Sequence, residues 1–236
     1  MVVPAFDEAA RIGPALASIG AYLDRQPWTG EIIVVLDGCR DATSDVVRRV
    51  AAARHDLRVL DNDVNRGKGY SVRRGMLEGR GARLLFTDAD LSTPIAETDR
   101  LLARLEAGFD VAIGSRALRD SVIRVRQPWW REGMGRLFNV AVRAARLADI
   151  RDTQCGFKAF TREAGRRIFE RQQLDRFAFD VEILWIARRL GCRVAEVPVA
   201  WENDRQSRVH PVRDSARMLR DLARIRLNAW RGRYDR

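Results

Sequence analysis

Two carboxylates one residue apart, Asp88 and Asp90, directly follow the apolar run 82–86. A strand that ends in this pattern presents carboxylate oxygens at the carboxyl edge of a sheet, where divalent cations are usually held together with substrate phosphates. The pattern therefore indicates chemistry on a nucleotide sugar. The alternative is a solvated turn, because loop ends are rich in aspartate.

Other polar residues follow other apolar runs in the same way. Asp37 follows the run 31–36, where a carboxylate could accept hydrogen bonds from a base or from a ribose hydroxyl. Lys68 lies between Gly67 and Gly69, and glycine allows the backbone to approach a phosphate closely. The segment lacks the length and the Ser/Thr of a Walker loop, which excludes a P-loop ATPase.

Short apolar runs alternate with helical patterns in the first half of the chain. The first helical pattern places Ile12, Leu16, Ile19 and Leu23 on one face. This alternation predicts an α/β fold with a mostly parallel, Rossmann-like sheet flanked by helices and a ligand crevice at the carboxyl ends of the strands. The predicted strands are 2–5, 31–36, 58–60, 82–86 and 110–114.

The alternation of apolar runs and helical patterns ends after Ser115, in the part of the chain expected to hold the acceptor. Helices are predicted near 134–147 and 181–190, a strand over 193–201, and a last helix over 213–230. The chain is interpreted as one domain with three parts. They are a nucleotide-sugar half (1–116), an acceptor half (117–212) and a basic amphipathic helix (213–236).

Composition limits the class of protein. With 236 residues, 46% of them hydrophobic, the chain can bury a full core as a single domain. No apolar run approaches the roughly 18 residues of a membrane span, and Asp7 and Glu8 come too early for a signal peptide. We therefore expect a cytosolic protein or one peripheral to the cytosolic face of a membrane. Cys39, Cys155 and Cys192 are expected to be reduced thiols.

The formal net charge of +11 indicates a polyanionic partner, such as phosphates or an anionic lipid surface. In the last helix, one side carries apolar residues and another side carries arginines. Such a helix either lies on an anionic membrane or docks on its own domain with its arginines in water. A basic nucleic-acid-binding protein is a further alternative, but no helix-turn-helix, zinc-finger or RNA-binding motif supports it.

Taken together and in order, these segments resemble the inverting family-two glycosyltransferases of the GT-A fold, and within them the dolichyl-phosphate glucosyltransferase and mannosyltransferase branch. The resemblance covers nearly the whole chain, and its acceptor-half motifs are most similar to the glucosyl branch. The segments that carry it are 3–8, 37–41, 66–69, 88–94, 114–116, 152–158, 177–182 and 196–199.

The resemblance implies roles for the donor-side residues. The nucleotide pocket would be lined by Pro4, Ala5, Glu8, Asp37 and Lys68, with Asp88 and Ala89 near the ribose and diphosphate. Asp90, helped by Asp88, would hold Mg²⁺ or Mn²⁺ against the two donor phosphates. Two departures from the family pattern bear on sugar and metal choice: Leu36 replaces the first acid of the usual Asp-Asp pair, and Ser92 stands where mannosyl relatives often have Gln.

The resemblance also implies the acceptor, a polyprenyl or dolichyl phosphate that attacks C1 without a strong general base. Arg116, Arg131 and Arg208 are the candidates to position it. The implied product is β-linked glucose from UDP-glucose, with mannose or an N-acetylhexosamine as alternatives. A soluble hydroxyl acceptor would instead need Asp180 or Glu182 as a base. The favoured interpretation of these two carboxylates is structural, as hydrogen-bond acceptors that hold the acceptor loop.

Overall fold

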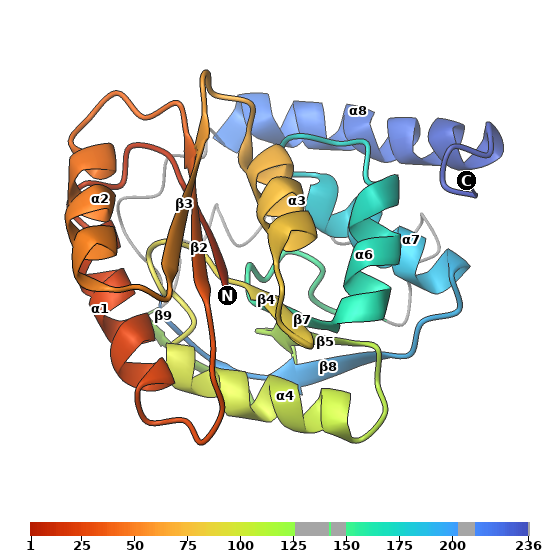
Figure 1. The fold of residues 1–236 in the computed structure, drawn as a ribbon. Coiled ribbons are helices and arrows are strands. Elements are labelled where there is room, and N and C mark those ends of the chain that lie inside the picture. The colour runs from red at the N-terminus through yellow and green to blue at the C-terminus, as the bar shows by residue number, and fades with distance from the viewer. Residues whose placement is uncertain (126–141, 143–149, 203–210, 236) are drawn as a thin grey trace.

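A seven-stranded sheet forms the centre of the protein (Figure 1). The structure, a computed structural model, describes residues 1–125, 142, 150–202 and 211–235. The strand order is β3-β2-β1-β4-β7-β5-β8. These strands are β1 (Val2–Ala5), β2 (Ile32–Asp37), β3 (Leu57–Asn62), β4 (Arg83–Phe86), β5 (Val111–Ser115), β7 (Lys158–Thr161) and β8 (Val194–Pro198). Two further strands, β6 (Val122–Val125) and β9 (Ala200–Glu202), pair with each other in a separate ribbon.

The sheet is mostly parallel, as the sequence predicted, with one antiparallel strand inside it. β7 lies between β4 and β5 and runs antiparallel to both, with Lys158 opposite Phe86 on one side and Ile113 on the other. This strand belongs to the acceptor half, whereas its two neighbours belong to the nucleotide-sugar half. The two halves therefore share one sheet.

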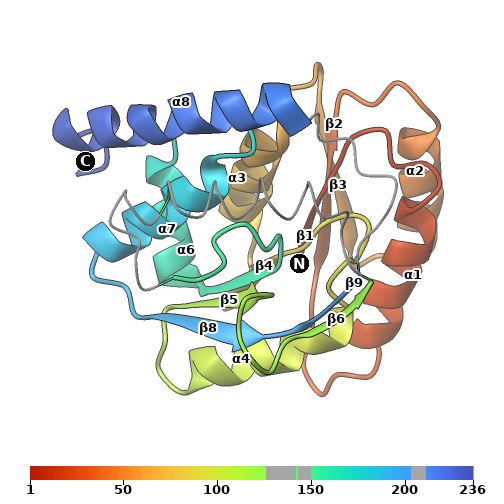
Figure 2. The same ribbon diagram turned by 180° about the vertical axis from the view of Figure 1, so that it is seen from behind.

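Helices cover both faces of the sheet (Figures 1 and 2). One face packs against α1, α2 and α4, and the other packs against α3, α6, α7 and α8. Successive residues of β2 alternate between the two cores, Ile33 and Val35 in one, Ile32 and Val34 in the other. Both faces of the strand are buried, which explains its continuous apolar sequence. The helices are α1 (Ile12–Leu23), α2 (Thr43–Ala53), α3 (Lys68–Glu78), α4 (Thr98–Glu106), α6 (Arg162–Arg171), α7 (Phe179–Arg189) and α8 (Pro211–Trp230), with a 3-10 turn, η1 (Ile95–Glu97), before α4.

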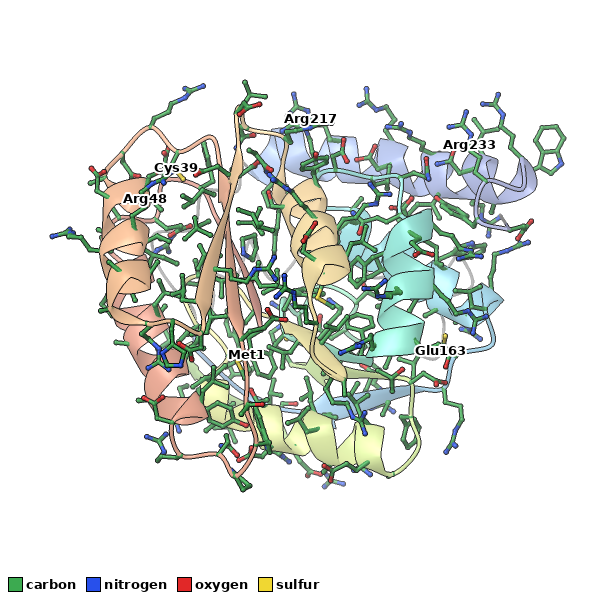
Figure 3. All side chains as sticks on the ribbon, viewed as in Figure 1. Met1, Cys39, Arg48, Glu163, Arg217 and Arg233 are labelled. Carbon is green, nitrogen blue, oxygen red and sulfur yellow. The ribbon has the colours of Figure 1, made fainter. Side chains whose placement is uncertain are left out.

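The carboxyl ends of the parallel strands meet at one edge of the sheet. In Figure 1 the loops that follow β2 and β3 lie at the top, on the side where α8 crosses the molecule. Figure 3 shows Cys39, just after β2, and Arg217 of α8 on that same side. Since β7 is antiparallel, its first residue, Lys158, lies at this edge too. The loop 152–157 before β7 is thus brought to the carboxyl ends of β4 and β5.

The structure divides one predicted strand and contains two elements that were not predicted. The predicted strand 193–201 is divided at Val199 into β8 and β9, since Pro198 has no N–H with which to continue a ladder. Helix α6 and strand β7 were not predicted. The helix predicted at 134–147 falls, apart from Val142, outside the described residues. Within the part of the chain that the structure describes, no helix is long and apolar enough to cross a membrane.

Helix α8 docks on the domain through part of its surface. Leu222 and Ile225 are buried in the core that also contains α3, α6 and α7. Tyr234, just beyond the helix, is 1% exposed and belongs to the same core. Trp230 is 84% exposed. Docking on the protein's own domain, one of the two alternatives for this helix, is therefore observed for the side that carries Leu222 and Ile225.

This packing makes a prediction about stability. Replacing Ile225 with Ala should lower the free energy of unfolding by about 2–4 kcal/mol, because it leaves a cavity in the core. Replacing the exposed Trp230 with Ala should change it by less than about 0.5 kcal/mol. Urea unfolding followed by circular dichroism measures both. Equal effects of the two substitutions would contradict this docking.

Candidate active site

Asp88 and Asp90 lie in a tight turn directly after β4. The N–H of Leu91 donates to the carbonyl of Asp88 at 3.2 Å, and the N–H of Ser92 donates to Asp90 Oδ1 at 2.9 Å. Leu91 has φ 47°, a left-handed conformation that is costly for a branched residue and is often found at functional sites. Burial and then the charge of Asp88 raise the pKa of Asp90. The turn therefore places the two carboxylates so close together that the charge of Asp88 disfavours ionisation of Asp90.

Lys68 is the cation of this turn. It begins α3, directly after Gly67 with φ 110°, and its Nζ lies 2.6 Å from Asp88 Oδ1. Burial alone would lower the pKa of Lys68, but the carboxylates of Asp88 and Asp180 outweigh it and raise the pKa. Lys68 is thus a permanent positive charge beside the turn. Its predicted place in the lining of the nucleotide pocket stays a prediction.

Asp37 shapes the loop that leads to Lys68. Its Oδ1 accepts hydrogen bonds from Asn62 Nδ2 at 2.8 Å and from the N–H of Arg66 at 2.9 Å, and its Oδ2 accepts from the N–H of Gly67 at 2.8 Å. The side chain is buried. The contact of Asp37 with the nucleotide, which the resemblance implies, stays a prediction. The structure adds that Asp37 orders the start of α3.

Pro4, Ala5 and Glu8 lie at the carboxyl end of β1, next to that of β2. Ala5 is buried opposite Leu36, and Pro4 is only partly buried. The N–H of Glu8 donates to Thr43 Oγ1 at 2.6 Å, which ties the loop after β1 to α2. The three residues thus border one edge of the sheet, but their contact with a nucleotide stays a prediction.

The loop before β7 touches the carboxylate turn. A Cβ on Gly156 would lie 2.1 Å from Asp88 Oδ2, so only glycine leaves room for this carboxylate. Ala89, the residue between the two acids, is buried in the core that the sheet forms with α1, α2 and α4. Asp88 of the nucleotide-sugar half and Gly156 of the acceptor half, 68 residues apart in sequence, are therefore in direct contact.

Arg116 is fixed by a partner that the sequence analysis did not identify. Its Nε and Nη2 donate to Asp152 at 2.7 and 2.8 Å, and its backbone N–H donates to the same carboxylate at 2.9 Å. Burial alone would raise the pKa of Asp152, but the Arg116 guanidinium outweighs it and lowers the pKa to about 2. Glu196 of β8 in turn accepts from the N–H groups of Arg151 and Asp152. The segment 152–158, which carries part of the family resemblance, drew attention to Asp152. Its pairing with Arg116 could not be predicted without the order of the strands.

Asp180 and Glu182 at the start of α7 both bind other groups of the protein. Asp180 forms a buried ion pair with Lys158 at 2.5 Å. Glu182 accepts hydrogen bonds from the N–H groups of Gln173 and Leu174. Burial raises the pKa of Glu182 to about 7. These bonds agree with the structural interpretation of the two carboxylates.

The donor set at the turn suits a cation that is shared with a substrate. Across the described residues, no group of three or more His, Cys, Asp or Glu side chains could hold a metal ion alone. Mg²⁺ is typically bound by one or two carboxylates together with substrate phosphates. Asp88 and Asp90 fit that arrangement, with further oxygens coming from the substrate. Arg131 and Arg208, the other predicted phosphate contacts, lie outside the described residues.

The contact between Gly156 and Asp88 yields a prediction. Gly156→Ala should force the Asp88 side chain away from Lys68 and lower sugar transfer by about 10- to 100-fold, since small displacements at a reacting centre are costly. The free energy of unfolding should fall by less than about 1.5 kcal/mol, because a single side chain can move aside. Initial rates and urea unfolding measure the two effects.

The matched control is Gly13→Ala on α1, where a Cβ would make an ordinary contact of 3.4 Å with Val46. It should leave transfer within about twofold of wild type. Full activity in the Gly156→Ala variant would show that the position of Asp88 is unimportant.

Comparisons with known proteins identify the family of this chain. The family model described as Glycosyl transferase family 2 matches residues 1–169. A dolichyl-phosphate β-glucosyltransferase of Trichomonas vaginalis is 37% identical over 234 residues, which cover 95% of this chain and 69% of the relative. Enzymes of the same name from Drosophila melanogaster and Homo sapiens are 36% and 34% identical, over 98% of this chain and 76% of each relative.

Solved structures share the fold. Glucosyl-3-phosphoglycerate synthase of Mycobacterium tuberculosis, solved with Mn²⁺ and UDP-glucose, has a TM-score of 0.70 at 21% identity and covers 96% of this chain and 77% of that chain. Mannosyl-3-phosphoglycerate synthase of Rubrobacter xylanophilus has a TM-score of 0.66 at 23% identity, over 98% and 74%. The predicted GT-A fold is confirmed. With the family model and curated relatives matching most of its length, the chain belongs to glycosyl transferase family 2.

Proposed function

We propose that this glycosyltransferase moves glucose from UDP-glucose to a polyprenyl phosphate such as dolichyl phosphate, giving a β-linked lipid-phosphate sugar, with Mg²⁺ or Mn²⁺ at Asp88 and Asp90. The observation that carries the proposal is the turn at 88–90, which contacts Lys68 of the donor half and Gly156 of the acceptor half. The relatives' names support the sugar and the lipid. The Mn²⁺ and UDP-glucose in the neighbouring structure support the donor and the metal.

The chemistry needs little proton transfer. An acceptor phosphate is already anionic near neutral pH, so one of its oxygens can form the new bond to C1. The bond from C1 to the diphosphate breaks, its electron pair leaves with UDP, and the configuration at C1 is inverted. A bound divalent cation would stabilise the charge on the departing diphosphate. Lys68 supplies a fixed positive charge at the same turn.

Arg116 would position the acceptor. Asp152 accepts hydrogen bonds from its Nε and Nη2, which fixes the plane of the guanidinium. We assign the remaining guanidinium nitrogen, Nη1, to the acceptor phosphate. Because two hydrogen bonds to Asp152 already hold the guanidinium, binding the phosphate costs less entropy. Arg131 and Arg208 complete the proposed phosphate contacts.

A soluble hydroxyl acceptor is not favoured, because it requires a general base at Asp180 or Glu182. Asp180 is paired with Lys158, and Glu182 accepts backbone hydrogen bonds. Mannose and N-acetylhexosamine donors are the alternatives that a direct assay separates.

The assay offers radiolabelled UDP-glucose, GDP-mannose or UDP-N-acetylglucosamine, each with and without Mg²⁺, to a short-chain polyprenyl phosphate. Label should enter the lipid from UDP-glucose only, and only with metal. Asp90→Asn should lower this transfer by at least about 100-fold, because it removes a charged cation ligand without changing side-chain volume. Asp45→Asn on the exposed surface of α2 is the control.

No lipid labelling from any donor, with UDP still bound tightly, would overturn the lipid acceptor. Full activity of the Asp90→Asn variant would overturn the metal site.

We also propose that the protein contacts the cytosolic face of a membrane peripherally through the outer surface of α8. This surface comprises Arg220, Arg224, Leu227, Trp230 and Arg231, all exposed and close in helical spacing. Leu227 and Trp230 are 42% and 84% exposed, an apolar pair among arginines that suits a lipid headgroup region. In Figures 1 and 2, α8 lies on the side of the loops that carry the site, where a lipid-linked acceptor would approach.

Arg220→Gln with Arg224→Gln should weaken binding to phosphatidylserine vesicles by about 10- to 30-fold, since each arginine near an anionic surface contributes about 1 kcal/mol. The matched control is Arg100→Gln with Arg104→Gln on α4, across the molecule from α8 in Figure 1. Vesicle sedimentation measures both pairs. Equal losses would mean that net charge, and not this surface, attracts the protein.

A further inference from the structure

Glu182 of α7 is a buried carboxylate that the proposed chemistry does not use. Its Oε2 accepts hydrogen bonds from the N–H of Gln173 at 3.1 Å and the N–H of Leu174 at 2.8 Å. Its Oε1 accepts a hydrogen bond from the hydroxyl of Tyr234 at 2.7 Å. One side chain therefore joins the loop before α7 to the segment that follows α8.

The loop at 172–176 is bonded in turn to the first residues of α3. Gln172 Nε2 donates to the carbonyl of Gly69 at 2.9 Å. The N–H of Tyr70 donates to the carbonyl of Asp175 at 3.1 Å. These bonds run in opposite directions between the same two segments, so neither segment can shift without breaking one of them.

The contact between the two segments is also tight. A Cβ on Gly67 would lie 2.4 Å from the carbonyl oxygen of Asp175, and one on Gly69 would lie 2.6 Å from that of Leu174. Lys68 lies between these two glycines and reaches Asp88 at 2.6 Å. The position of the Lys68 ammonium thus depends on where the loop 172–176 lies.

Tyr234 is itself held in place. It is 1% exposed, and its carbonyl accepts a hydrogen bond from Arg171 Nε at 3.1 Å. The next residue, Asp235, pairs with Arg189 of α7 at 2.7 Å. The C-terminal segment is therefore anchored at the tyrosine and at the residue after it, and the tyrosine hydroxyl donates to Glu182.

We propose that Glu182 is a positioning residue which, bonded to Tyr234, holds the loop 172–176 against α3 and so places Lys68 for the donor diphosphate. The inference rests on the proposed function in one respect, that Lys68 contacts the diphosphate. It gives the C-terminal segment a part in donor binding although that segment lies outside the site.

The positioning role requires a side chain at 182 of the right shape that accepts hydrogen bonds, but it requires no charge. A general base, in contrast, must be a carboxylate that can take up a proton. In Glu182→Gln, the amide oxygen can still accept from both backbone N–H groups and the amide nitrogen can donate to the Tyr234 oxygen. Glu182→Ala leaves all three donors without an acceptor. Tyr234→Phe removes one hydroxyl and keeps the ring in the core.

The experiment compares these three variants of the full chain with wild type and with Tyr22→Phe. Tyr22 is a matched control, because its buried hydroxyl also donates to a carboxylate, that of Asp99 at 2.5 Å, but between α1 and α4. Two quantities are measured: the affinity for UDP with Mg²⁺ by calorimetry, and the rate of amide hydrogen exchange at 67–71. The second needs no ligand.

Tyr234→Phe should weaken UDP binding by about fivefold, the loss expected for one ordinary hydrogen bond, and should speed exchange at 67–71. Glu182→Ala, where it folds, should exceed both effects. Glu182→Gln should remain within about twofold of wild type. Tyr22→Phe should lose stability without changing either quantity.

Wild-type exchange at 67–71 in a folded Tyr234→Phe variant would overturn the inference. So would equal effects of Tyr22→Phe, since global stability would then be the cause. Losses in Glu182→Gln as large as those in Glu182→Ala would show that the charge matters and would also overturn it. A wild-type protein that binds no UDP would refute the proposed donor, while hydrogen exchange would still decide the positioning role.

Discussion

The close approach of Asp88 to Gly156 is the constraint on which the site depends. Two parts of the chain meet there because β7 enters the sheet between β4 and β5 in the antiparallel direction. Any other direction would put the loop 152–157 at the opposite edge, away from the carboxyl ends of β4 and β5. The sheet order thus turns two separate motifs into one site, and glycine at position 156 is the local condition for that contact.

Two ion pairs at this edge set the geometry of the site more than the stability of the fold. Arg116 with Asp152 and Lys158 with Asp180 each join a strand end to a loop or helix. Removing two charges from water costs about as much free energy as their attraction returns, so such pairs add little net stability. Their directional bonds instead fix where the guanidinium and the acceptor loop lie, and a transferase that works mainly by positioning needs this.

The sequence predicted the parts of the fold that depend on local pattern. The five strands of the first half lie within one or two residues of their predicted bounds, because continuous apolar runs mark strands covered on both faces. β7 was missed because this short strand begins with a charged residue, Lys158, and contains only two consecutive apolar residues, Ala159 and Phe160. Pairings such as Arg116 with Asp152 depend on which strands are neighbours, and no spacing along the chain encodes that order. Lys68 was expected near a phosphate because glycines flank it, but its pairing with Asp88 again depended on the order of the strands.

The inner side of helix α8 packs on the domain, its outer side is the proposed membrane contact, and the packing limits how the membrane contact can be tested. Leu222 and Ile225 belong to the core, and the segment beyond the helix supplies the Tyr234 hydroxyl to Glu182. Deleting the helix would therefore expose apolar core and leave a buried carboxylate short of a donor, so a loss of membrane binding after such a deletion would not be specific. The outer arginines and Trp230 can be replaced without touching that packing. If this surface contacts lipid, the same helix connects the membrane to the loop that positions Lys68, and ordering of its C-terminal end at a membrane would favour the donor-binding geometry.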